Sequence, residues 1–383
     1  EITSPTTKGG LTGKVTAAID GSAPIQVDLK RSEPTLAYGN ETGTSMAAPH
    51  AIGALGLLFQ RYPYLSAMQV RDVLLTTAQD IGEPGIDDKY GWGLIDLKKG
   101  MEGYGQLRVD TDVVMNSRAG GSKLWSGPAW DDWRNDIGAK GRLTKSGEGW
   151  LRLSGQNSFA GASVRDGVLE FSGDNRLQGR VEVDGGQLLL SGQLHGSDLL
   201  VRSGTATIDG RVHDGQVTVQ SGGRLQGVGM LAALDMAGTL APAGAAIGAL
   251  HVSGDYVQRA GSVLQVDVKA PREADQLVVA GHATLEGGTV QVAAQPGVFL
   301  LGQRYTVLTA AKGVNGRFAA PGYSSFPATQ FPYTDLEQTD ATGRRDGLLS
   351  RYPSRLQPKV IYTNTPVEYW GQGRAAALAH TRI

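Results

Sequence analysis

The sequence predicts a chain of more than one domain, in which the last part of an α/β domain precedes a long all-β solenoid. A serine-containing motif opens a helical stretch before residue 104, and short alternating apolar runs begin near residue 141. Glycine accounts for 55 of the 383 residues. So much glycine is atypical of a single α/β enzyme and typical of a turn-dense β structure, and the length allows two or three domains.

Two helices are expected between residues 46 and 80. Apolar residues recur at helical spacing from Ile52 onward, and Arg61-Tyr62-Pro63 ends this first helix. Ser66 with Gln69 three residues later forms a capping-box pattern, which predicts a second helix to about residue 80. Both helices carry apolar stripes that need a covering sheet.

Ser45 is the candidate catalytic nucleophile. It lies in the segment Gly43-Thr44-Ser45-Met46-Ala47-Ala48-Pro49-His50, between a glycine and a run of small residues that opens the first helix. A serine hydroxyl is a good nucleophile only when it is held rigidly and when backbone N–H groups can receive the developing oxyanion. The alternative is a helix-capping serine without chemistry, but capping requires only the hydroxyl and none of the surrounding pattern.

This segment resembles the nucleophile motif of the subtilisin-like serine peptidases. Tyr90-Gly91-Trp92-Gly93-Leu94-Ile95-Asp96 is similar to the segment that closes their catalytic domain, so residues 39–103 match the last part of that fold in order and spacing. The resemblance implies that residues 1–103 are the C-terminal part of a subtilisin-like domain. It also implies a serine endopeptidase that hydrolyses peptide bonds of protein or peptide substrates through a Ser/His/Asp triad.

Ser45 is the one triad residue that can be assigned in this sequence. In the subtilisin-like order the aspartate and histidine precede the serine, yet no histidine precedes Ser45. His50 lies about 140° around the helix from Ser45 at 3.6 residues per turn, so packing or a local hydrogen bond is expected for it. Asp20 and Asp28 are expected at the surface, and no upstream asparagine matches the family's oxyanion hole. The domain is therefore interpreted as truncated, with its triad histidine and aspartate upstream of Glu1, and this chain alone is expected to be inactive.

Composition excludes several functions. The formal net charge of −1 and the scattered Lys and Arg residues give no electrostatic reason to expect nucleic acid as a partner. A chain without cysteine forms neither disulfides nor thiolate metal sites. No cofactor is identifiable, and the calcium common among subtilisin-like peptidases cannot be placed on any residues. There is no signal peptide at Glu1 and no run of about 18 apolar residues.

A parallel β-helix is expected from residue 141 to 325. Short alternating apolar runs are separated by glycine-rich turns at intervals of about 12 to 25 residues, as stacked coils require. The turn segments include Asp166-Gly167-Val168-Leu169, Asp184-Gly185-Gly186-Gln187-Leu188 and Ser221-Gly222-Gly223-Arg224-Leu225. A β-sandwich is the structural alternative. Asp275 is interpreted as a strand-end or turn carboxylate, because no partner histidine or acid lies at a useful spacing.

The glycine-rich part resembles the passengers of bacterial autotransporters. The resemblance is carried by residues 141–169, which are similar to the passenger repeat, and by residues 222–320, which are similar to the end of such a passenger. It implies a right-handed parallel β-helix with an autochaperone-like end, export through the outer membrane of a Gram-negative bacterium to the cell surface or beyond, and the protein's own translocator barrel as a partner. The alternative function is a non-catalytic, adhesin-like surface protein that carries a protease remnant.

Two segments have less defined expectations. Residues 104–140 are expected to be a linker that packs the protease against the first coil, with Trp125, Trp130 and Trp133 closing the end of the β-helix; a sugar-binding aromatic platform is the alternative. Residues 326–383 form a tail of uncertain fold, similar in short segments to an uncharacterised α/β-hydrolase-like family but without a nucleophile motif. This tail is either a junction of unrelated reading frames or a divergent end.

Overall fold

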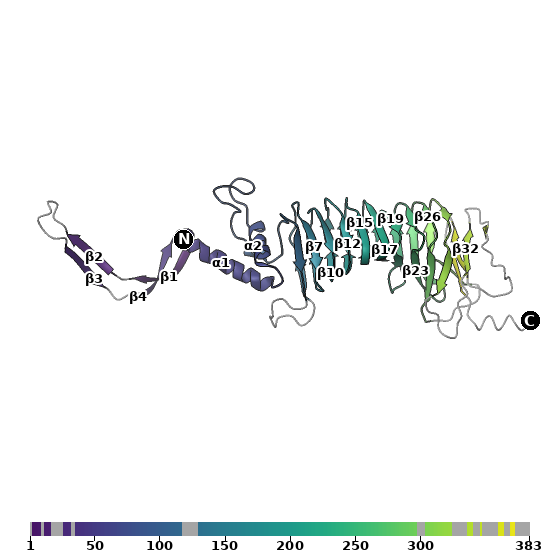
Figure 1. Cartoon of the computed structure of the whole chain (residues 1–383), viewed down its shortest axis with the longest axis horizontal. Helices are drawn as coiled ribbons and strands as arrows, with labels where there is room; N and C mark the ends of the chain where they lie inside the picture. The colour runs from purple at the N-terminus through teal and green to yellow at the C-terminus, as the bar shows by residue number, and fades with distance from the viewer. Residues whose placement is uncertain are drawn as a thin grey trace, which may run out of the picture. The chain divides into compact units, whose positions relative to one another are not determined.

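The chain forms two compact units, Glu1–Arg61 and Tyr62–Ile383. The computed structural model describes residues 42–116, 129–296 and 305–319 with their side chains, and further strands by their backbone (Figure 1). The first unit pairs β1 (Ile2–Lys8) with β4 (Thr35–Glu41) and β2 (Leu11–Thr16) with β3 (Gln26–Arg31), both antiparallel, and ends in helix α1 (Thr44–Arg61).

The second unit begins with helix α2 (Ala67–Thr76), whose N-cap is Ser66, and the short helix α3 (Leu97–Gly100). The capping box predicted for Ser66 and Gln69 is confirmed, because each side chain bonds the backbone N–H of the other. The predicted ends of the two long helices agree with the observed ones within a few residues.

Parallel strand pairing builds the rest of this unit as a stack of coils, which confirms the predicted β-helix. The larger sheet contains β5 (Thr111–Val114), β6 (Trp130–Trp133), β7 (Arg142–Ser146), β8 (Trp150–Leu153), β9 (Gly161–Val164), β10 (Val168–Phe171), β12 (Val181–Val183), β13 (Gln187–Leu190), β15 (Leu199–Ile208), β17 (Gln216–Gly227), β19 (Ala233–Met236), β20 (Thr239–Pro242), β22 (Tyr256–Gln258), β23 (Val263–Lys269), β24 (Glu273–Ala274), β26 (Ala283–Leu285), β27 (Thr289–Ala294), β30 (Val314–Gly316) and β31 (Ala320–Tyr323). A second sheet contains β11 (Asp174–Asn175), β14 (Gln193–Leu194), β16 (Arg211–Val212), β18 (Met230–Leu231), β21 (Ala249–Val252), β25 (Gln276–Val279) and β29 (Leu308–Ala310). Only β24 in these two sheets pairs antiparallel, with β23.

Long strands bend from one face of the coil to the next. Leu199–Val201 of β15 continues the face of β12, whereas Thr205–Ile208 of the same strand continues the face of β13. A shift in register between Val201 and Ser203 marks the bend. A β-bulge of this kind redirects a strand without breaking its pairing with the neighbouring coil.

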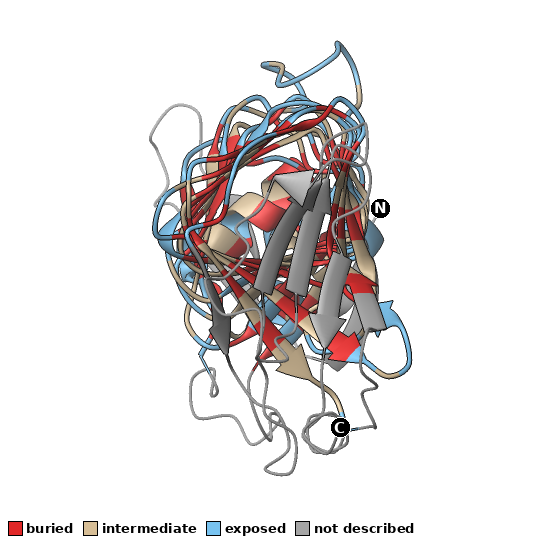
Figure 2. Cartoon of the chain, turned by 90° about the vertical axis from the view of Figure 1, so that its right-hand side faces the viewer, coloured by how far each residue is buried: buried red, intermediate tan, exposed pale blue. Residues whose placement is uncertain are grey.

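An apolar ladder runs along the interior of the coils. Its members occupy one register position in successive strands and are all buried: Leu151, Leu169, Leu188, Ala206, Leu225, Leu240, Leu264 and Val290. From Leu151 to Leu225, successive members are 18 or 19 residues apart in the chain. A single coil cannot cover its own apolar side, so stacking with its neighbours stabilises it. Figure 2 shows buried residues along the strands and exposed residues in the peripheral loops.

Strands lie within the described part of residues 104–140, the predicted linker. Strand β5 pairs in parallel with β7, and β6 pairs in parallel with β8, so the coils begin well before residue 141. These strands could not be recognised in the sequence, because the segments around them lack the Gly-Gly-x-Leu turns of the later coils. Residues 117–128, with Trp125, lie outside the described part of the chain.

The α2 region packs against the first coils, within the compact unit that begins at Tyr62. Trp133 is fully buried, its ring centroid lies 5.1 Å from that of Tyr104, and its Nε1 donates to Tyr64 Oη at 3.0 Å. Tyr64 Oη in turn donates to the buried Asp131 carboxylate. The prediction that tryptophans close the end of the β-helix is confirmed for Trp133, whereas Trp130 is 48% exposed.

A further sheet joins the tail to the end of the second unit. It contains β28 (Gln303–Thr306), β32 (Asp335–Thr339), β33 (Arg345–Asp346), β34 (Lys359–Thr363) and β35 (Glu368–Gly371). Strand β35 of the tail pairs antiparallel with β28, which precedes residue 326. The tail therefore shares a sheet with a strand from the preceding part of the chain. The tail's side chains are outside the described residues, and its similarity to an α/β-hydrolase-like family stays a prediction.

Candidate functional site

Ser45 lies in the first turn of α1 and is exposed. The helix starts at Thr44, and the carbonyl oxygen of the preceding Gly43 accepts hydrogen bonds from Met46 N and Ala47 N, each at 3.1 Å. A side chain at Gly43 would meet only Met46 Sδ, at 3.8 Å, so the approach to Ser45 from this side is open. The first backbone N–H groups of a helix have no partner within it and carry partial positive charge. Ser45 is therefore exposed at the N-terminal end of a helix, where the helix dipole is positive.

His50 has the local role that the sequence predicts. Its Nδ1 lies 3.0 Å from the carbonyl oxygen of Met46, one turn earlier in the same helix. This contact holds the ring on its own helix. Of the two upstream acids, Asp20 lies outside the described residues, and Asp28 falls in β3, where only the backbone is described.

Helix α1 exposes large apolar side chains. Ile52 is 67% exposed, Leu57 48% and Phe59 42%. A helix in a folded domain normally buries such residues against a neighbouring element. This exposed apolar surface agrees with the expectation that the helix requires a covering sheet.

The segment from Tyr90 to Asp96 is built by backbone contacts. Gln79 and Leu94 exchange two backbone hydrogen bonds, of 2.7 and 2.9 Å. Gly93 precedes Leu94 and has φ +100°, and a Cβ there would lie 2.0 Å from the Gln79 carbonyl oxygen. Only glycine fits this position.

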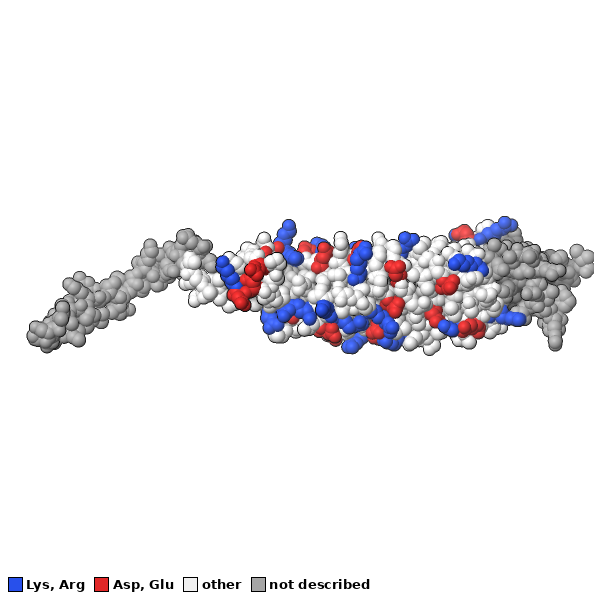
Figure 3. Space-filling model, turned by 90° about the horizontal axis from the view of Figure 1, so that it is seen from above, with Lys and Arg blue, Asp and Glu red and all other residues white. Residues whose placement is uncertain are grey.

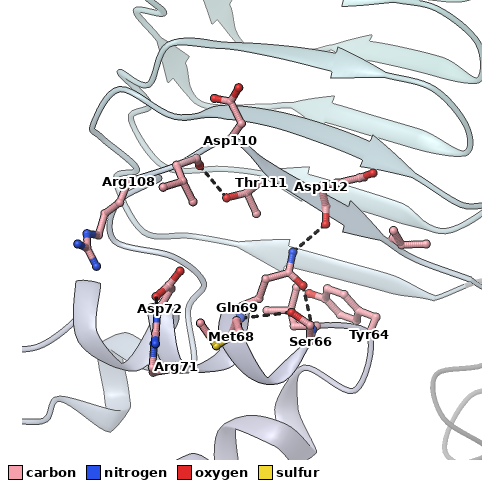
Figure 4. Close-up of a pocket in the computed structure, with 13 residues that line it drawn as sticks. Tyr64, Ser66, Met68, Gln69, Arg71, Asp72, Arg108, Asp110, Thr111 and Asp112 are labelled. Atoms are coloured by element: carbon pink, nitrogen blue, oxygen red, sulfur yellow. Dashed lines mark hydrogen bonds and ion pairs between the residues drawn. The ribbon is translucent and has the colours of Figure 1, made fainter.

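A cavity of about 840 Å³ lies between α2 and β5, inside the second unit (Figure 4). Its serine, Ser66, is engaged in capping α2: Ser66 N donates to Gln69 Oε1 at 2.8 Å, and Gln69 N donates to Ser66 Oγ at 3.4 Å. Gln69 Nε2 spans the cavity and donates to the Asp112 carbonyl oxygen at 2.7 Å. None of the residues that line the cavity is a histidine. Ser66 in this cavity therefore acts as the cap of α2.

Lys145 and Asp275 are buried inside the coils, and both bond the backbone. Lys145 Nζ donates to three carbonyl oxygens at 2.6 to 3.2 Å, and burial lowers the pKa of Lys145 to about 8. Asp275 accepts from Gly248 N at 3.0 Å and from Asp267 N at 2.9 Å, and burial raises the pKa of its carboxyl to about 7. The prediction that Asp275 is a strand-end carboxylate is confirmed, because it lies between β24 and β25.

Charged side chains of both signs lie beside one another on the face shown in Figure 3. Arg202 bonds Glu182 at 3.0 Å and also contacts Asp184. Within the described ranges, no three His, Asp or Glu side chains are placed to hold a metal ion. None of the helices described is long and apolar enough to cross a membrane.

Comparison with known proteins identifies two segments. Residues 8–93 match the Subtilase family, and residues 143–171 match the Passenger-associated-transport-repeat. An extracellular serine protease of Serratia marcescens is 33% identical over 325 residues, which are 75% of this chain and 27% of that protein. The Neisserial autotransporter lipoprotein NalP of Neisseria meningitidis serogroup B is 37% identical over 186 residues, covering 46% of this chain and 16% of NalP.

A shorter similarity falls on a subtilisin. Subtilisin DY of Bacillus licheniformis is 40% identical over 84 residues, which are 22% of this chain and 29% of that protein. The chain thus spans under a third of the length of each of these curated relatives.

Proposed function

We propose that the chain is part of a secreted subtilisin-like serine endopeptidase. The premise is that the chain joins a subtilase segment to an autotransporter passenger repeat on a parallel β-helix. The observation that carries the proposal is Ser45, which is exposed in the first turn of α1 inside the subtilase match. Its substrates are peptide bonds of extracellular proteins. The names of the relatives, an extracellular serine protease and an autotransporter, support this function and the location outside the cell.

In the proposed reaction, Ser45 Oγ attacks the carbonyl carbon of the scissile peptide bond. A histidine takes the hydroxyl proton, an aspartate orients that histidine, and N–H groups near the start of α1 stabilise the oxyanion. The histidine then protonates the leaving amine, and water hydrolyses the acyl-enzyme. The histidine and aspartate belong to protein upstream of Glu1, since no histidine precedes Ser45 in this chain. The exposed apolar side of α1 supports a covering sheet from the same source.

A fluorophosphonate probe, which labels activated serines, tests this function. The chain from Glu1 to Ile383 should label no more strongly than its Ser45→Ala variant, because an unassisted serine lacks a base within about 3 Å. The full-length product of the parent gene should label, and Ser45→Ala should abolish the labelling. Ser66→Ala is the matched control, because Ser66 caps a helix and should leave the labelling unchanged.

Two outcomes would contradict the proposal. Strong labelling of the isolated chain at Ser45 would show that the base lies within residues 1–383. A folded full-length protein that neither labels nor cleaves casein would favour the non-catalytic, adhesin-like alternative.

The proposed partner, a translocator barrel in the outer membrane, is tested separately by locating the full-length protein in fractionated cells.

A further inference from the structure

Two exposed tryptophans share one register position on the outer face of the first coils. Trp130 of β6 is the parallel partner of Trp150 of β8, and they are 48% and 37% exposed. Adjacent strands are about 4.8 Å apart, so both indoles leave the same face from neighbouring coils. The next residues in this register are Val168, which is partly buried, and the polar Gln187. The aromatic surface therefore spans two coils and then ends.

A row of charged side chains lies two residues further along the same strands. Asp132, Arg152 and Glu170 are in register with one another, and they share the face of the tryptophans because side chains alternate along a strand. Trp150 Nε1 donates to Glu170 Oε2 at 3.0 Å, and Arg152 Nε lies 3.8 Å from Glu170 Oε1. Arg152 Nε also donates to Ser172 Oγ at 2.9 Å. These contacts fix the ring of Trp150 beside Glu170. Arg152, which lies next to Glu170, is itself held by Ser172.

This combination favours a small amphipathic ligand over other partners. The cores of protein interfaces are depleted of charged residues, whereas three charged groups border these two rings. Arg152 is paired with Glu170, and Asp132 is paired with Arg134, so the surface offers little attraction to an ionic ligand. A sugar ring is complementary to it, because its C–H face can pack on an indole while its hydroxyls bond carboxylate and guanidinium groups.

We propose that Trp130 and Trp150, with Asp132, Arg152 and Glu170, form a binding surface for an uncharged oligosaccharide. Neighbouring sugar rings of the oligosaccharide lie on neighbouring tryptophans, and the polar row bonds their hydroxyls. The site is independent of Ser45 and of the proposed peptidase activity. It would hold the protein at a glycan-bearing surface.

The test uses the full chain and a panel of uncharged oligosaccharides, namely cello-, chito-, malto- and mannohexaose and a galactan fragment. Tryptophan fluorescence and calorimetry should detect saturable binding of at least one of them. Trp130→Ala and Trp150→Ala should each weaken that binding at least about tenfold, as loss of an aromatic anchor does, and the double variant should abolish it. Val228→Ala, which removes an exposed apolar side chain elsewhere on the coils, should leave it unchanged.

Circular dichroism of each variant shows whether the coils are intact, and little change is expected for exposed residues. Failure of every oligosaccharide in the panel to bind would overturn the proposal. So would binding that survives in the folded double variant. If the wild-type chain self-associates and the double variant does not, without any sugar binding, the surface is a protein contact instead.

Discussion

Replacing Trp133 with alanine should loosen the packing of the α2 region on the first coils while leaving the later coils folded. Trp133 is among the largest fully buried side chains, packs on Tyr104 and donates to Tyr64. Truncating a buried tryptophan to alanine costs about 3–5 kcal/mol. Since about 1.4 kcal/mol is a factor of ten, local opening of residues 62–116 should become roughly a hundredfold to a few thousandfold more frequent. Stability in a solenoid is nearly a sum of local terms, so the effect should fade within a few coils.

Hydrogen exchange followed by mass spectrometry measures this directly, peptide by peptide. Trp130→Ala is the matched control, because it removes the same side chain three residues earlier on the same strand, where it is 48% exposed. This control should change exchange by less than about threefold, corresponding to the roughly 0.5 kcal/mol typical of surface substitutions. Equal loss of protection in the two variants would refute the assignment of Trp133 to the interior and of Trp130 to the outer face.

Two further predictions concern stability. Burial raises the pKa of the Asp275 carboxyl to about 7 in the folded state, against about 3.9 in the unfolded state. Between pH 4 and pH 7, roughly, the folded state therefore keeps a proton on Asp275 that the unfolded state has lost. The free energy of unfolding of the coils should therefore fall as pH rises from about 4 to about 7, and urea unfolding of Asp275→Asn should lack this fall; an equal fall in both would contradict it. Gly93→Ala should cost about 1–3 kcal/mol more than Gly85→Ala, because both positions have positive φ but only at Gly93 does a Cβ clash with backbone. Comparable melting temperatures of these two variants would count against the tight turn.

The interior ladder of the coils could be predicted from the sequence because each strand encodes it locally. Alternating residues such as Leu151 and Leu153, bounded by glycine turns, carry the periodicity of a strand and the repeat of a stacked coil. The motif around Ser45 was equally readable, because its small residues and helix start are contiguous. The comparisons confirm the two family resemblances.

The packing of the α2 region could not be predicted, because it depends on contacts between distant segments. Tyr64 and Asp131 are 67 residues apart in sequence, and neither stands out in a local pattern. The first coils pack against this helical region on one side. Their turns therefore lack the glycine pattern of turns that stack between two coils. A partly buried tyrosine hydroxyl beside a carboxylate is visible only once the two segments are placed side by side.

The spacing of the interior ladder also bears on how such a chain can change over evolutionary time. Between Leu151 and Leu225, each coil has 18 or 19 residues and adds one member to the ladder. Loss or duplication of a whole coil would keep every remaining apolar residue facing inward, whereas loss of one residue within a strand would turn the rest of that strand inside out. Genes for proteins built this way can therefore lengthen or shorten by recombination in steps of one coil, while single-residue deletions are eliminated.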